Sequence, residues 1–229
     1  MSDHKIQKKV KLFEKDMLKV FLGTLIVLII IELIAYFILF KDIPQFIEKY
    51  GYYTALLIMT VVINATALYH IKSFKRTIPC MTGMMIGMTL GMTSGLSIGM
   101  IVGATNGMFF GGLAGVIIGM AVGVWAGNCC GVMGVMEGMM AGIMGGTMGP
   151  MIALMSLAYV KPFISFILLM LFLVIISLIY LMYKEELYIE EKTEYKGYSF
   201  IYFSSICILV TLILTLIMVY APKSLLIGV

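Results

Sequence analysis

Charged side chains are scarce in this chain. Asp, Glu, Lys and Arg make up only 12% of its 229 residues, whereas 62% are hydrophobic. Soluble domains carry about 25% charged residues, and a chain with half that share would aggregate in water. The composition therefore excludes a soluble globular domain and predicts an all-α membrane protein, because helices satisfy their own backbone groups in lipid.

The motifs of common enzymes are missing as well. No P-loop, no zinc-binding HExxH and no dinucleotide-binding glycine fingerprint occurs in the sequence. Histidine is limited to His4 and His70, so Ser94 in MTSGLS has no histidine in a later span to serve as its base. We expect no enzyme activity. Because the sequence has no nucleotide-binding segment, uphill transport would draw on an ion gradient or a partner.

A cleavable signal peptide is not expected. Six lysines fall within the first 19 residues, and the apolar stretch 18–40 that follows is too long for a signal peptide and has no small-residue cleavage site. We predict a basic cytoplasmic segment, 1–17, and a retained first span. The net charge of +4 comes from basic residues at the ends of apolar segments, so membrane topology explains it and no nucleic-acid partner is predicted.

Long hydrophobic runs define the organisation of the chain. The run 80–158 has 79 residues, which as one helix would extend roughly 118 Å across a hydrocarbon core of about 30 Å. It therefore needs three passes, with turns at Asn106 and Asn128. The prediction is about seven transmembrane helices: two within 18–71, a Gly/Met-rich core of three within 80–158, and two within 162–220. The individual spans are 18–40, 52–71, 80–103, 107–127, 131–158, 162–183 and 198–220.

The distribution of basic residues orients these spans. With the N-terminus inside, the inner segments collect twelve basic residues and the outer segments four. This bias predicts a multi-pass protein of a bacterial plasma membrane, with a cytoplasmic N-terminus and an external C-terminus. The charged loop 184–197 is then cytoplasmic, as a solvated connector. The inner basic residues are Lys5, Lys8, Lys9, Lys11, Lys15, Lys19, Lys72, Lys75, Arg76, Lys184, Lys192 and Lys196; the outer ones are Lys41, Lys49, Lys161 and Lys223.

Glycine recurs at every fourth position through the core. Small residues at this spacing let helix backbones approach closely in lipid, so we predict a bundle packed through GxxxG faces. Because a period of 4.0 exceeds the 3.6 of an α-helix, the glycine stripe drifts around each helix and meets several partners, within the chain or in a homo-oligomer. The glycines predicted to pack helices are Gly83, Gly87, Gly91, Gly95, Gly99, Gly103, Gly107, Gly111, Gly115, Gly119, Gly123, Gly127 and Gly131, followed in a second phase by Gly134, Gly138, Gly142 and Gly146.

Sulfur-bearing residues concentrate in the same core. Sixteen of the 22 methionines lie between residues 80 and 155. Thioethers and thiols are soft ligands that suit Cu(I), although methionine also fills gaps beside glycine, and packing alone is the competing explanation. In the predicted topology His70 and three cysteines share the cytoplasmic end of the bundle. The candidate metal residues at this end, and next to the intramembrane carboxylate Glu137, are His70, Cys80, Cys129, Cys130, Met133, Met136 and Met140.

Two carboxylates fall inside predicted spans, Glu32 and Glu137. An acidic residue at a helix centre costs about 2.5–3.5 kcal/mol on insertion scales, so such groups are protonated, bind a cation or touch water. Glu137 lies between two ladder glycines and is flanked by methionines, which predicts a cation or proton site inside the bundle. A neutral, hydrogen-bonded carboxylic acid is the alternative. For Glu32 that structural role is the preferred interpretation.

One resemblance rests on the methionine and glycine pattern. The segments MTGMMIGMTLGMTSGLSIGM and MEGMMAGIMGGTMG, within residues 80–155, make the chain similar to Gly/Met-rich bacterial integral membrane proteins, some of them attached to cupredoxin-like copper domains. The resemblance places Glu137 at the glutamate of the motif. By association with those proteins, the resemblance implies the handling of copper or another metal, with metal-handling proteins as partners.

These observations lead to one preferred function and two alternatives. The preferred hypothesis is a membrane protein that moves or senses a cation, with Cu(I) or another soft metal as its cofactor or cargo. The first alternative is a non-transporting scaffold or accessory subunit assembled by glycine packing. The second is a small-ion channel without metal preference.

Overall fold

The computed structural model describes residues 22–23, 25–27, 29–30, 46–73, 80–156, 159–188 and 200–221. This part of the chain is helical and contains no strand. The elements are α2 (Phe46–Ser73), α3 (Cys80–Asn106), α4 (Met108–Gly127), the short 3₁₀ helix η2 (Asn128–Cys130), α5 (Gly131–Met155), α6 (Val160–Tyr188) and α7 (Phe200–Tyr220).

Several of these helices have the length and composition of membrane spans, which confirms the all-α, multi-pass prediction. Five described segments qualify, and α7 contributes a shorter apolar segment, Ser205–Tyr220. The expected first span, 18–40, lies largely outside the described residues. The total of seven spans, and the orientation from the charge rule, stay predictions. The five segments are Tyr50–Tyr69, Cys80–Asn106, Met108–Gly127, Gly131–Met155 and Val160–Leu181.

The long central run folds into three helices with breaks near the predicted asparagines. Gly107, with φ of 88°, separates α3 from α4, and Gly131, with φ of 70°, follows η2 at the start of α5. Both are left-handed conformations that side chains with a Cβ rarely adopt, so glycine is required there. These two residues therefore make turns, and the predicted packing role is wrong for Gly131, because a Cβ there would meet nothing within 4 Å.

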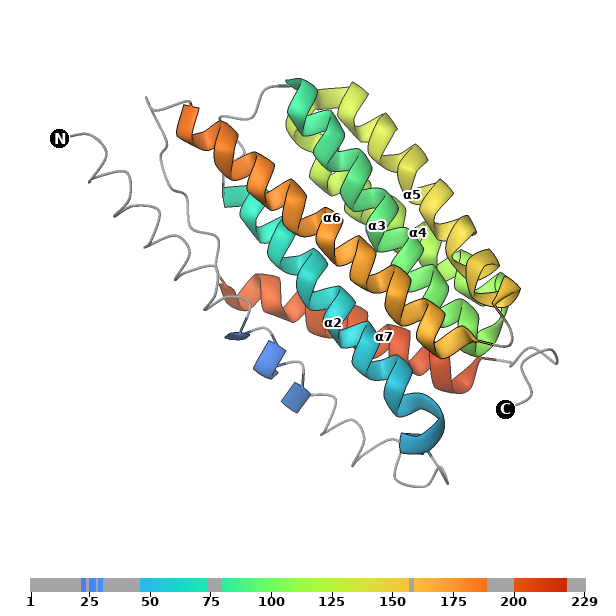
Figure 1. Cartoon of the computed structure of the whole chain (residues 1–229). Coiled ribbons are helices and arrows are strands. Elements are labelled where there is room, and N and C mark those ends of the chain that lie inside the picture. Colours follow the sequence, from blue (N-terminus) through green and yellow to red (C-terminus); the bar gives the residue numbers. More distant parts are fainter. Residues whose placement is uncertain are drawn as a thin grey trace.

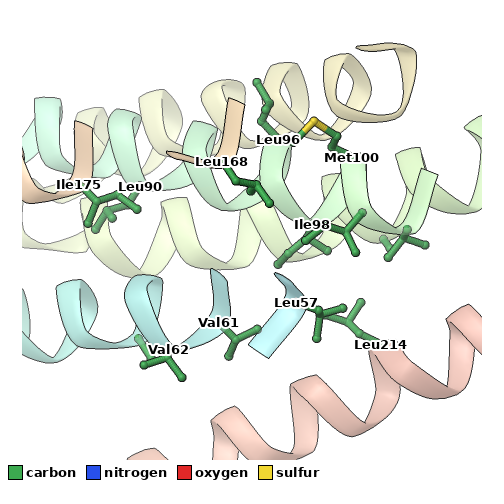
Figure 2. Close-up of a cluster of buried hydrophobic side chains, with 14 of the residues drawn as sticks. Leu57, Val61, Val62, Leu90, Leu96, Ile98, Met100, Leu168, Ile175 and Leu214 are labelled. Atoms are coloured by element: carbon green, nitrogen blue, oxygen red, sulfur yellow. The ribbon is translucent and has the colours of Figure 1, made fainter. Parts of the chain in front are cut away.

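Helix α3 is the centre of the arrangement (Figure 1). On one side it packs against α4 and α5, and on the other side against α2, α6 and α7. Ordinary apolar side chains fill this second side: Leu57 of α2, Leu168 of α6 and Leu214 of α7 are almost fully buried, and Figure 2 shows them close to Ile98 of α3. The two sides of α3 thus pack by different means.

On the first side, backbone meets backbone. A Cβ placed on Gly95 of α3 would lie 2.9 Å from the carbonyl oxygen of Gly142 in α5 and 3.3 Å from that of Gly115 in α4. Real Cβ atoms essentially never come within 3.0 Å of another heavy atom, so these positions admit only glycine without a shift of the helices. The axis of the three-helix cluster is therefore closed by peptide groups at this level.

The same kind of contact repeats along the cluster. Gly91 faces the carbonyl oxygen of Gly138, and Gly99 faces that of Gly146, so α3 and α5 run in the same direction with α4 antiparallel to both. Two close contacts lie outside the predicted four-residue phases, at Gly145 and Gly149, which both meet the backbone of α3. The glycines whose added Cβ would meet another helix within 3.0 Å are Gly87, Gly91, Gly95, Gly99, Gly103, Gly111, Gly115, Gly119, Gly123, Gly127, Gly134, Gly138, Gly142, Gly145, Gly146 and Gly149.

Candidate functional site

The contact line between α3 and α5 reaches the surface of the three-helix cluster. An added Cβ on Gly145 would lie 3.1 Å from the backbone nitrogen of Leu96, and it would also meet the carbonyl oxygen of Met92. Because the two backbones touch, the side chains next to the contact line turn outward on each helix. We call the surface along this line, towards the start of both helices, the α3–α5 seam.

Methionines form the α3 side of the seam. Met81, Met85, Met88 and Met92 are 77%, 63%, 49% and 37% exposed. Their spacing of three and four residues places them on one face of the helix. The last of them, Met92, is the residue whose carbonyl oxygen meets Gly145 of α5. These four thioethers therefore lie along the flank of α3 that borders α5.

The α5 side carries Glu137. Its side chain is exposed. Glu137, Ala141 and Gly145 follow one another at four-residue spacing, and Gly145 contacts α3, so Glu137 lies on the part of α5 that borders α3. Methionines continue this surface: Met133, Met136, Met140 and Met144 are 68%, 60%, 66% and 56% exposed.

This placement corrects the prediction of a site inside the bundle. Glu137 was expected to point inward because its neighbours Gly134 and Gly138 pack helices, and both glycines are buried. Successive helical residues are rotated by about 100°, so the carboxylate beside Gly138 points away from the contact that Gly138 makes. The carboxylate and most core methionines therefore face outward, while Met100 is an exception with no exposed surface.

Glu137 lies near one end of the cluster. It is the seventh residue of α5, so it stands about 9 Å along the helix axis from Gly131. Helical side chains tilt towards the helix N-terminus, which here is the end formed by η2 and the start of α3. The carboxylate therefore points towards the end of the cluster that holds Cys80 and Cys130.

Cys80 and Cys130 come together at that end, across 50 positions of sequence. The Cys130 thiol donates to the carbonyl oxygen of Cys80, with 3.0 Å between sulfur and oxygen. The Cys80 thiol reaches the carbonyl oxygen of Cys130 at 3.7 Å. The sequence-based prediction that these two cysteines share one end of the bundle is therefore consistent with the folded topology.

Other predicted site residues are not placed. Glu32 and the side chains of His70 and Cys129 lie outside the described residues. Among the side chains that are described, no three from His, Cys, Asp and Glu gather as a ligand cluster. The donors that the structure brings together are thus two thiols at the end of the cluster, and thioethers with one carboxylate along the seam.

The hydroxyl groups of Thr93, Ser94 and Ser97 in α3 form hydrogen bonds within their own helix. Thr93, Ser94 and Ser97 donate to carbonyl oxygens three or four residues earlier in their own helix, instead of bridging helices. Asn106 does bridge: its Nδ2 donates to the carbonyl oxygens of Ile217 and Ala221, at 3.2 Å and 3.1 Å. This bond ties the end of α3 to the end of α7.

Five methionines of the seam were not among the metal residues predicted from the sequence: Met81, Met85, Met88, Met92 and Met144. The signal was present in part, since Met81, Met85, Met88 and Met92 follow helical spacing. Two other methionines of the core, Met84 and Met120, are half-buried.

Neither family models, nor curated proteins, nor solved structures match this chain. The seam and the cysteine pair are the features of the described residues that bear on its function.

Proposed function

We propose that this protein binds a soft cation, with Cu(I) as the best candidate, on the α3–α5 seam and moves it across the membrane. The observation that carries the proposal is that exposed thioethers of α3 and Glu137 of α5 lie on the two sides of one backbone contact line. Thioether sulfur is a soft ligand that favours Cu(I) over the hard cations. The carboxylate adds the negative charge that thioethers lack.

The position of Glu137 supports a cationic ligand. A carboxylate on the outer face of an apolar helix is expensive in lipid unless it is neutralised. Within the described residues Glu137 forms no ion pair, and its neighbours on the seam are methionines. A bound monovalent cation would neutralise the charge and would gain sulfur ligands at the same time.

The route of the ion follows from the packing. Peptide groups close the axis between α3, α4 and α5, since an added Cβ on Gly95 would meet both other backbones. A path between these three helices is therefore unsuitable, and the proposed path is the seam. Enclosing it from lipid requires a cover, and the predicted homo-oligomer supplies one if a second copy packs on the outer face of α5.

The binding step is tested by the metal content of the purified full-length protein. Wild-type protein loaded with Cu(I) under reducing conditions and then desalted should retain copper when measured by mass spectrometry. In a Cys80→Ser background, which removes one of the two thiols at the end of the cluster, Glu137→Gln should lower the retained copper at least threefold. Thr147→Val is the matched control, because Thr147 is exposed on the same helix and its hydroxyl donates to Ile143 and Met144 of that helix. Wild-type protein without copper above background would end the proposal.

A second candidate function, a non-transporting scaffold, is favoured by the glycine contacts. Backbone contacts from Gly87 to Gly149 would make a rigid three-helix unit whose exposed methionines adapt to a partner surface. A scaffold predicts normal complex assembly and unchanged metal content in Glu137→Gln. A transporter predicts the loss of metal with assembly intact.

A further inference from the structure

The first residue of α3 and the last residue of η2 bring two thiols within reach of one ion. Each cysteine directs its sulfur to the carbonyl oxygen of the other, at 3.0 Å for Cys130 and 3.7 Å for Cys80. The arrangement is reciprocal, so the two side chains lie across a single narrow gap. To share a ligand, the two sulfurs would turn towards it by rotation about their Cα–Cβ bonds.

This gap is accessible. Cys80 is exposed and Cys130 is partly exposed, whereas the third described thiol, Cys207 of α7, is 8% exposed. Two strongly exposed methionines are close to the pair in the sequence: Met81 follows Cys80 in α3, and Met133 is the third residue of α5. The donors at this end of the cluster are therefore two thiols with thioethers next to them.

We infer that Cys80 and Cys130 form a two-thiolate site for a soft monovalent metal ion, with Cu(I) as the expected occupant. Thiolates are the ligands that such ions prefer. Two thiols and one Cu(I) yield a bis-thiolate complex of charge minus one, and both thiol protons pass to solvent. No electron is transferred. The cysteine site lies at the end of the seam and would pass the ion to the seam. In that step the inference rests on the proposed function.

The connection to the seam is short. Met81 and Met85 continue along α3 from Cys80, and Met133 leads along α5 from Cys130 to Glu137. An ion released by the thiolates would therefore meet thioethers on either helix before it reaches the carboxylate. Because the predicted topology puts this end at the cytoplasm, the thiolates would bind the ion there first, and the weaker thioether ligands would receive it for transfer outward.

The test uses the full chain, purified under reducing conditions and titrated with Cu(I) against a chromophoric Cu(I) chelator. Wild-type protein should withdraw one tightly bound equivalent and show thiolate-to-copper charge-transfer absorption in the ultraviolet. Cys80→Ser and Cys130→Ser should each lower that affinity at least a hundredfold and remove the absorption. Cys207→Ser is the matched control and should behave as wild type. Unchanged binding in both Cys80→Ser and Cys130→Ser would overturn the inference.

A second measurement needs no substitution. Cu(I) should slow maleimide labelling of Cys80 and Cys130 in wild-type protein at least tenfold, as read by peptide mass spectrometry, and equal labelling with and without Cu(I) would overturn the inference. Failure of the cysteine site can be distinguished from failure of transport along the seam. If Glu137→Gln and wild type both bind copper at the thiols but neither moves it, the pair stands and transport along the seam is wrong.

Discussion

Gly103 of α3 and Gly111 of α4 meet just across the turn that joins their helices. A Cβ on Gly111 would lie 2.6 Å from the backbone nitrogen of Gly103, and 2.8 Å from the carbonyl oxygen of Gly99. The next residue, Gly112, has only Pro150 near it, with the Cγ atom at 3.9 Å, which is ordinary contact. Two adjacent glycines therefore have opposite surroundings.

The contrast between Gly111 and Gly112 predicts that the same substitution changes stability differently at these two positions. Gly111→Ala should lower the thermal stability of the detergent-solubilised protein, because overpacking costs about 1–3 kcal/mol. Gly112→Ala should leave stability unchanged or raise it slightly, since alanine is the better helix former. Unfolding followed by circular dichroism measures both. Equal effects of the two substitutions would mean that the backbones of α3 and α4 do not touch as described.

Asn106 predicts a second stability effect, at the opposite end of α3 from the cysteines. Asn106→Ala removes two hydrogen bonds to the last turn of α7, at Ile217 and Ala221. Interhelical polar contacts in membranes contribute about 0.6–2 kcal/mol, so a loss of that size is expected. Asn128→Ala is the control, because Asn128 is exposed in η2. Proteolysis of the α7 end should accelerate in Asn106→Ala, and an unaltered rate would argue against the link.

The methionines of the seam predict a change in copper affinity without a change in fold. Replacing Met88 and Met92 together with leucine keeps volume and apolar character, so stability should change by less than about 1.5 kcal/mol. Copper affinity on the seam should fall about tenfold, which corresponds to about 1.4 kcal/mol of lost sulfur ligation. The same exchange at Met151 and Met155, exposed near the other end of α5, is the matched control. Equal affinities in the two double variants, measured in a Cys80→Ser background, would remove the seam methionines from the site.

The three central helices could be predicted from the sequence because length and turn chemistry both constrain them. A run of 79 residues cannot cross once. Asn106 directly precedes the turn glycine Gly107, and Asn128 lies three residues before Gly131. The meeting of Cys80 with Cys130 followed from the same topology. These predictions needed only the order of the helices.

The direction of the side chains could not be predicted in the same way. Glycines and methionines both recur at four-residue spacing, so either set fits one face of a helix, and the pattern does not say which face meets a neighbour. Glu137 and Gly138 are adjacent in sequence but point about 100° apart, and only the contact of Gly138 with Gly123 decides which of them is inside. Helix rotation is a property of the packed cluster.

Flux of Cu(I) into proteoliposomes tests the central claim most directly. Vesicles that contain the purified chain should take up Cu(I) faster than protein-free vesicles, and Glu137→Gln should slow that uptake about tenfold, the factor expected when about 1.4 kcal/mol of cation stabilisation is lost. Thr147→Val vesicles, matched for protein content and orientation, should take up the ion at the wild-type rate. Uptake by wild-type vesicles no faster than by protein-free vesicles would contradict the account.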